Sequence, residues 1–278
     1  MRLVTFRTEG GTRAGRLEGG DVVVLDWPDA GALIASGEDW VARAAAADGE
    51  RLPLAGLRLA PPVLAPPAIV CVGRNYAAHA AEMRAEVGGF PTLFAKYASS
   101  LLGPRDDLVL PEVSAKVDWE VELAFVVGRR GRRLDPGAAR GCIGAYTVAN
   151  DVSMRDWQRR TTQFLQGKTF EASNPLGPFL ATPDELPAAP EDGLRLTCSV
   201  DDEVVQDGTT KDLVFPVDEI AAYISTFMTL EPGMLVLTGT PDGVGAGRTP
   251  PVFLRPGQVL TSAVEGLGEL VNRCVAQR

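Results

Sequence analysis

The sequence predicts an α+β protein that is mainly β, on three observations. The 278 residues include 30 glycines and 21 prolines but only 6% aromatic residues, which indicates many turns and favours strands and loops over a helical bundle. Short apolar runs suited to strands recur without the regular strand–helix alternation of a doubly wound sheet or an eight-repeat barrel. No period of about 20–50 residues recurs, so a solenoid also fits badly.

Residues 1–60 are expected to form a small β-rich domain. Gly19 and Gly20 separate two apolar runs and predict a hairpin, and a weakly amphipathic helix is expected over residues 30–47. Four prolines lie between Pro61 and Pro67, which makes this segment extended and semi-rigid. We therefore place a proline-rich linker at residues 61–67 and a larger second domain at residues 68–278.

The second domain is expected to contain many short strands and few helices. Strands are predicted over residues 69–72, 108–110, 117–127, 144–149, 194–200, 234–238 and 258–264. Helices are predicted over residues 77–86, 153–164 and 217–227.

Excess acidic charge limits the classes of partner. Lys and Arg total 27 against 36 Asp and Glu, and the net charge of −9 repels nucleic-acid phosphates and anionic lipid surfaces. The same field repels a small anionic substrate, so a site for one needs local positive charge from a metal ion, Lys or Arg. No apolar run approaches the roughly 18 residues of a spanning helix, and the amino terminus lacks the apolar stretch of a signal peptide. We expect a cytoplasmic protein with no nucleic-acid or membrane partner.

Two carboxylates are expected on one face of a strand. Between Val117 and Val127, apolar residues alternate with Asp118, Glu120 and Glu122, a period of two that is typical of a strand. Glu120 and Glu122 would then leave the same face about 7 Å apart, whereas on a helix they would diverge by about 200°. The run continues apolar on both faces, which indicates an interior position, and buried like charges need a cation. A solvated strand face opposite lysines is the alternative.

Asp151 is a third carboxylate in a similar context. A run rich in β-formers ends at Asn150 and Asp151, and Ser153 is suited to cap a following helix, so Asp151 is expected where a strand meets a helix. Three carboxylate ligands suit a hard cation, because oxygen ligands select Mg²⁺, Mn²⁺ or Ca²⁺ over Zn²⁺ or copper. Taken alone, Asp151 is also consistent with an Asx turn or a helix cap.

His79 is the only histidine of the chain. On the helix expected over residues 77–86, His79 and Glu82 lie three residues apart on one face and can hydrogen-bond. A carboxylate on one imidazole nitrogen leaves the other nitrogen basic, as a general base requires. An exposed His–Glu pair on a small helix is the alternative.

A glycine-rich stretch follows an apolar run between Thr238 and Pro251. It lacks the Gly-Lys-Ser/Thr ending of a phosphate loop, and the two prolines after it forbid the helix that a dinucleotide fingerprint requires. Backbone N–H groups and the Thr240 hydroxyl could still approach a small anion. A plain connecting loop is the alternative.

These segments, taken together, resemble the fumarylacetoacetate hydrolase superfamily in its smaller bacterial branch. The resemblance begins at about Pro67 and extends to the carboxyl terminus. It is carried by residues 72–82, 118–124, 149–158, 166–170, 175–178, 229–233, 238–245 and 265–270, in family order. The resemblance implies a mixed β-sandwich roll with peripheral helices, paired into a homodimer.

The resemblance also implies roles for individual residues. Glu120, Glu122 and Asp151 would hold one Mg²⁺ or Mn²⁺, and His79 and Glu82 would form a dyad on a lid over the ligand. Family residues that contact the substrate or its surroundings correspond to Arg74, Tyr76, Gln158, Lys168 and Thr240. Arg159 and Arg160 follow Gln158 and would supply either a second carboxylate contact or only a basic helix surface.

A hard cation, a His–Glu base and a lysine suit cleavage beside a 2-oxo acid. We expect hydrolysis of a C–C bond in a 2,4-diketo acid of the acylpyruvate or fumarylpyruvate type, with His79 and Glu82 activating water and Lys168 neutralising developing charge. Oxaloacetate decarboxylation, or isomerisation, hydration or dehydration of a related 2-oxo acid, uses the same enolate and is the closest alternative. A non-catalytic metal-dependent binding module is a third.

Overall fold

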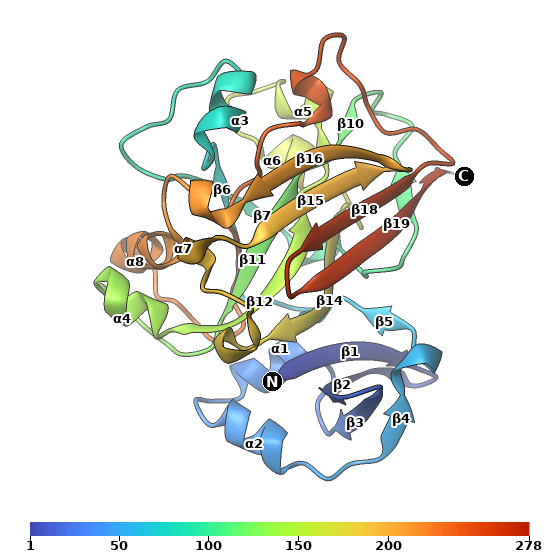
Figure 1. Cartoon of the computed structure of the whole chain (residues 1–278), viewed down its shortest axis with the longest axis vertical. Coiled ribbons are helices and arrows are strands. Elements are labelled where there is room, and N and C mark those ends of the chain that lie inside the picture. Colours follow the sequence, from blue (N-terminus) through green and yellow to red (C-terminus); the bar gives the residue numbers. More distant parts are fainter. Residues whose placement is uncertain (278) are drawn as a thin grey trace.

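Two sheets packed face to face form the framework of the protein in the computed structural model, which describes residues 1–277 (Figure 1). The mainly β architecture predicted from the sequence is confirmed. The larger sheet is formed by β1 (Arg2–Thr8), β2 (Gly11–Glu18), β3 (Asp21–Leu25), β4 (Arg51–Pro53), β5 (Leu59–Ala60), β6 (Ile69–Gly73), β7 (Thr92–Lys96), β8 (Leu101–Leu102), β11 (Val121–Val127), β12 (Ile143–Asn150), β14 (Asn174–Ala181) and β17 (Leu235–Leu237). Its main path runs β4-β3-β2-β1-β14-β12-β11-β17-β6-β7.

The smaller sheet covers one face of the larger one. It is formed by β9 (Leu108–Leu110), β15 (Arg195–Val200), β16 (Glu203–Thr209), β18 (Val259–Val264) and β19 (Gly268–Ala276), in the order β16-β15-β18-β19-β9. Contacts between β12 and β18 and between β14 and β19 join the two layers. A separate two-stranded ladder pairs β10 (Val117–Asp118) with β13 (Ser153–Met154).

Short helices lie at the periphery of the sheets (Figure 1). They are α1 (Ala30–Ala35), α2 (Trp40–Ala46), α3 (Ala77–Glu82), α4 (Pro136–Arg140), α5 (Arg155–Gln158), α6 (Leu165–Lys168), α7 (Pro190–Gly193) and α8 (Val217–Phe227). Among the described residues, none of these helices combines the length and the hydropathy needed to cross a membrane.

Strand β11 lies at the centre of the molecule because both of its faces are apolar. Every one of its residues is buried. Leu123 and Phe125 point into the core between the two sheets, whereas Ala124 and Val126 point into a second core on the other face. Alternate side chains of β11 therefore pack into two different cores, and Glu122 on this strand lies in the interior.

Several predicted elements have the expected positions. The strands expected over 69–72, 108–110, 144–149, 194–200, 234–238 and 258–264 correspond within a residue to β6, β9, β12, β15, β17 and β18, and the helix over 217–227 is α8. Strands β7, β14, β16 and β19 were not predicted. Strand β14 contains Pro175 and Pro178, and proline, which cannot donate to a ladder, argues against a strand when only the sequence is read.

Four predicted elements need correction. The continuous strand over 117–127 is interrupted after Asp118. The helix over 30–47 is two helices, because Gly37, with φ +140°, breaks it. The helix over 77–86 ends at Glu82, and Arg84, with φ 55°, takes the left-handed conformation that closes a helix.

The expected helix over 153–164 is also wrong at its start. Ser153 and Met154 pair with Asp118 and Val117, so this segment begins as a strand and only residues 155–158 are helical. The Ser153 hydroxyl donates to the Asp151 carbonyl instead of capping a helix.

The amino-terminal unit continues the larger sheet. Strand β1 pairs with β14, with Leu3 opposite Leu180, and β2 to β4 extend the sheet beyond it at the bottom of Figure 1. The division into residues 1–60, a linker and residues 68–278 stays a prediction.

Candidate active site

Three buried carboxylates meet where β11 and β12 approach the β10–β13 ladder. Glu122 lies on β11, Asp151 directly follows β12, and Glu120 lies between β10 and β11. One oxygen from each carboxylate lies within 4.8 Å of the others. The structure thus brings together the three residues that the sequence predicts as metal ligands.

Side chains hold the backbone where the strand is interrupted. The N–H of Glu120 donates to Oδ1 of Asn150 at 2.9 Å, and the N–H of Val121 donates to Oε1 of Gln206 at 3.0 Å. The N–H of Asp151 donates to the carbonyl of Glu120 at 2.8 Å. These bonds replace ladder bonds, so the break does not leave buried backbone groups unpaired.

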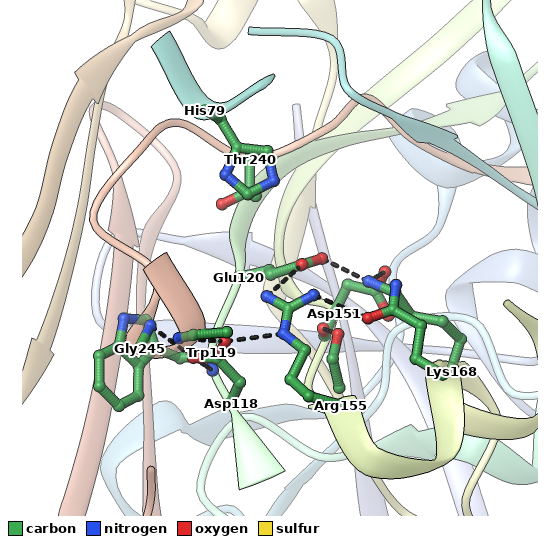
Figure 2. Close-up of polar contacts among 12 residues, drawn as sticks. His79, Asp118, Trp119, Glu120, Asp151, Arg155, Lys168, Thr240 and Gly245 are labelled. Carbon is green, nitrogen blue, oxygen red and sulfur yellow. Dashed lines mark hydrogen bonds and ion pairs between the residues drawn. The ribbon is translucent and has the colours of Figure 1, made fainter. Parts of the chain in front are cut away.

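Three buried cations contact Glu120 and Asp151 of the triad, and Figure 2 shows two of them, Arg155 and Lys168. Nζ of Lys168 contacts Glu120 at 2.5 Å and Asp151 at 2.7 Å. Nζ of Lys96 contacts the other oxygen of Asp151 at 2.5 Å. Nη2 of Arg155 lies 2.7 Å from Glu120.

The local charges leave one carboxylate without a cation. Of the triad, Glu120 and Asp151 have Lys or Arg partners, but no such ion pair forms with Glu122 within residues 1–277. Its Oε2 accepts only the N–H of Gly239, at 2.7 Å. Burial, followed by the charges of Asp151 and Glu120, raises the pKa of Glu122 well above its usual range. A buried carboxylate aimed at two others fits a divalent cation, and the all-oxygen donor set fits Mg²⁺ or Mn²⁺.

Neighbouring charges keep Glu120 and Lys168 ionised. Burial favours neutral Glu120, but Lys168 and Arg155 outweigh it and lower the pKa of Glu120 to about 2. Burial also favours neutral Lys168, yet Asp151 and Glu120 raise the pKa of this lysine to about 12. Lys168 therefore stays cationic at neutral pH and acts through its charge.

The only histidine faces this site from helix α3. Nδ1 of His79 lies 3.4 Å from Oε2 of Glu82, so the pair predicted from the sequence spacing is in contact. The other carboxylate oxygen of Glu82 accepts the N–H of Gly243 at 3.0 Å, which holds the carboxylate in place. With Nδ1 engaged, Nε2 is the ring nitrogen available to a ligand.

One cavity of about 920 Å³ is lined by Glu120 and Glu122 of the triad and by the His79–Glu82 dyad, whereas Asp151 is fully buried and is not part of the lining. The lining of the cavity also includes Arg74, Gln158, Arg159 and Thr240 from the sequence prediction, together with Arg155. Two hydrogen-bond donors on cavity-lining residues have no acceptor within residues 1–277. Nε2 of Gln206 donates to the Thr240 hydroxyl at 2.8 Å, which leaves its proton to donate, and Nη1 of Arg155 donates to Oε1 of Gln158 at 3.0 Å, which leaves the amide NH₂.

Two residues considered in the sequence analysis lie away from this cavity. Tyr76 is 2% exposed, packs in the core and is not part of the lining. Arg160 stacks over the ring of Trp157 at 3.5 Å, so of the two neighbouring arginines only Arg159 lines the cavity.

The sequence analysis assigned no role to Lys96, Arg155 or Asp118. Lys96 lies in a strand without a motif, 55 positions before its partner Asp151, and nothing local indicates it. Arg155 and Asp118 lie inside segments that were recognised, and their charge beside predicted ligands is the signal that could have indicated them.

Comparisons with known proteins identify the family of the chain. Residues 68–275 match the family described as fumarylacetoacetate (FAA) hydrolase C-terminal, and residues 1–62 match the one described as Rv2993c-like, N-terminal. The chain is 45% identical over 235 residues to oxaloacetate tautomerase FAHD2A, mitochondrial, of Homo sapiens, a match that covers 84% of this chain and 74% of that protein.

Solved structures are similar over the full length. Fumarylacetoacetate hydrolase from Exiguobacterium antarcticum has a TM-score of 0.85 and 34% identity, with 100% of both chains covered. 5-Carboxymethyl-2-hydroxymuconate delta-isomerase from Mycobacterium smegmatis has a TM-score of 0.82 and 30% identity, also with 100% of both chains covered. The resemblance inferred from the sequence blocks is confirmed, and the chain belongs to the fumarylacetoacetate hydrolase family.

Proposed function

We propose that the protein is a divalent-metal-dependent enzyme that catalyses keto–enol tautomerisation of oxaloacetate. The observation that carries the proposal is the buried triad of Glu120, Glu122 and Asp151, two of whose members, Glu120 and Glu122, line one cavity together with the His79–Glu82 dyad. The human relative named for this reaction supports the choice of substrate.

Each residue has a chemical task in this proposal. A bound Mg²⁺ or Mn²⁺, held by the triad, would supply Lewis-acid stabilisation of negative charge on the 2-oxo oxygen. Lys168, which remains protonated, adds positive charge beside the same carboxylates. Ketonisation removes a proton from the enol oxygen and adds one at C3. In ketonisation the protonated Nε2 of His79 donates a proton to C3, the enol-oxygen proton passes to solvent water, and His79 regains a proton from solvent, while Glu82 fixes the ring orientation.

Positive charge at the cavity suits an anionic substrate in a protein of net charge −9. Arg74, Arg84 and Arg159 line the cavity beyond the triad. Their guanidinium groups can meet the carboxylate of oxaloacetate that is remote from the 2-oxo group. A small anionic 2-oxo acid is thus the proposed substrate class.

Hydrolysis of a 2,4-diketo acid is the second candidate. The His79–Glu82 dyad also supports hydrolysis, because His79, oriented by Glu82, could deprotonate a water molecule for attack on a distal carbonyl. The two candidates differ in products: tautomerisation conserves the carbon chain, whereas hydrolysis of an acylpyruvate releases pyruvate.

The test uses the full chain with Mg²⁺ or Mn²⁺ and follows two reactions. We expect enol-oxaloacetate to ketonise faster than in buffer, measured by loss of enol absorbance, with the acceleration abolished by EDTA. His79→Ala should lower this rate by about 10²–10⁴-fold and keep Mn²⁺ binding. Glu86→Gln, which changes an exposed carboxylate just beyond α3, is the matched control and should have no effect.

If the protein releases pyruvate from acylpyruvates but does not accelerate ketonisation of oxaloacetate, the tautomerase proposal is wrong and the hydrolase function is supported. If a protein shown to carry metal accelerates neither reaction above its rate in buffer, both proposed functions are rejected.

A further inference from the structure

Asp118 is a completely buried carboxylate outside the acidic triad, and it accepts hydrogen bonds from two different parts of the structure. Oδ1 accepts the N–H of Gly245 at 2.7 Å, and Oδ2 accepts the N–H of Ala246 at 3.0 Å. Oδ2 also accepts Nε of Arg155, at 2.7 Å. Figure 2 shows Asp118 with Arg155 and Gly245, near Glu120 and Asp151. Asp118 does not line the cavity, so it acts on the site through its neighbours.

On one side, Asp118 orients Arg155. The guanidinium is planar, so a bond at Nε fixes the direction of both terminal nitrogens. Those nitrogens reach Glu120, with Nη2 at 2.7 Å, and Gln158, with Nη1 at 3.0 Å. The position of one predicted metal ligand and of one cavity-lining amide therefore depends on the contact between Asp118 and Arg155.

On the other side, Asp118 holds the glycine loop, which we define as residues 243–247. The first N–H of this loop, from Gly243, donates to Oε1 of Glu82 at 3.0 Å. The last residue, Gly247, lies so close to Glu82 that an added Cβ would overlap its side chain. An added Cβ on Gly245 would approach Oδ1 of Asp118 to 2.8 Å. The loop thus lies directly between Asp118 and the carboxylate that orients His79.

We propose that Asp118 is a positioning residue that couples the two halves of the site. Through Arg155 it places Glu120, and through the glycine loop it places Glu82, so one buried carboxylate sets the distance between the metal ligands and the His–Glu base. This inference rests on the proposed function for its activity readout, but not for its other two readouts.

The experiment compares Asp118→Asn with a matched control in the full-length protein. Asn keeps the shape of Asp but places an NH₂ group opposite N–H donors and removes the charge that faces Arg155. Asp106→Asn is the control, because Asp106 also accepts from an arginine, Arg7 at 2.5 Å, and from a loop N–H, that of Gly103 at 3.0 Å, away from the cavity.

Two readouts need no substrate. We expect Asp118→Asn to speed amide hydrogen exchange at Gly245 and Ala246 and to weaken Mn²⁺ affinity by about 10- to 100-fold, the usual cost of losing a residue that orients a ligand. Asp106→Asn should change neither. Unchanged Mn²⁺ affinity in folded Asp118→Asn would overturn the proposal, and this outcome is independent of whether oxaloacetate is the substrate.

The third readout separates positioning from a general loss of stability. At saturating Mn²⁺, kcat of Asp118→Asn should fall by about 10- to 100-fold with little change in KM. In the double variant Asp118→Asn/Glu82→Gln, the fold-decrease in kcat should be far smaller than the product of the fold-decreases in the two single variants, because both changes act on the carboxylate of Glu82. If the fold-decrease in kcat of the double variant equals the product of the two single fold-decreases, Asp118 and Glu82 are not coupled through the glycine loop.

Gly247→Ala covers the case in which Asp118→Asn does not fold. The added methyl group displaces Glu82 without altering a buried charge. It should lower kcat and leave Mn²⁺ affinity unchanged, because only the dyad side of the site is disturbed. Wild-type kcat in Gly247→Ala would overturn the contact between the loop and Glu82 on which the proposal depends.

Discussion

Glu122 is the carboxylate of the triad that has no Lys or Arg partner within residues 1–277. Glu120 and Asp151 each contact a buried Lys or Arg, whereas within residues 1–277 Glu122 accepts a single backbone N–H. A buried carboxylate without a cation is costly when it is ionised. The protein tolerates this cost at a position where a divalent cation would remove it, which connects the raised pKa of Glu122 to metal binding.

Glu122→Gln should change how the stability of the metal-free protein depends on pH. The pKa of Glu122 is raised in the folded state, so the folded wild type binds more protons than the unfolded chain, and its free energy of unfolding falls as pH rises through the folded pKa. The variant lacks this loss and should be the more stable protein at pH 8. Urea unfolding of EDTA-treated proteins between pH 5 and pH 8 measures the difference. Parallel curves for the two proteins would contradict the charge assignment.

The residues of the site could be predicted from the sequence where a local pattern or a family motif contains them. Alternation on a strand indicated Glu120 and Glu122, and a three-residue spacing indicated His79 and Glu82. Lys96 could not be found in this way, because its contact with Asp151 joins segments that meet only in the folded chain.

Among the elements, the interrupted strand explains both a success and an error of the sequence analysis. The alternation correctly carries Glu122 into the interior on β11. The break after Asp118 lets β10 pair with β13, and that ladder replaces the start of the helix expected over residues 153–164. Periodicity within a segment cannot reveal such a pairing, because the partner is more than 30 positions away.

Strand β7 matters to the site because it delivers Lys96. Lys96→Met should destabilise the protein by about 3–5 kcal/mol, since it leaves a buried carboxylate with one counterion fewer. Arg105→Met is the control: the ion pair between Arg105 and Glu269 is exposed, and its loss should cost less than about 1 kcal/mol. Denaturant unfolding of both variants gives the comparison. Equal, small losses would show that Lys96 is not needed to neutralise Asp151.

At the scale of the whole molecule, the amino-terminal unit shares a core with the centre of the larger sheet. Leu3, Leu33 and Ile34 pack in the same cluster as Ala124 and Val126 of β11. The unit matched by its own family model is therefore joined to the rest by a continuous sheet as well as by the chain. A homodimer and a cytoplasmic location stay predictions.

Removal of residues 1–60 should prevent stable folding of the remainder. It uncovers β14 and one face of β11, and burial of each large side chain that is lost contributes about 1.5–3 kcal/mol against a typical total stability of about 5–15 kcal/mol. Circular dichroism and thermal unfolding of residues 61–278 measure this. A cooperative transition near that of the full chain would show that the two units fold independently.

Glu120, Glu122 and Asp151 are proposed to hold together a divalent cation that the reaction needs. The most direct measurement is Mn²⁺ titration of the EDTA-treated protein with ketonisation of oxaloacetate followed at each point. We predict one Mn²⁺ per chain, a rate that rises in proportion to occupancy, and loss of both in Glu122→Gln. Full activity in protein shown to be free of metal, or wild-type Mn²⁺ binding by Glu122→Gln, would contradict it.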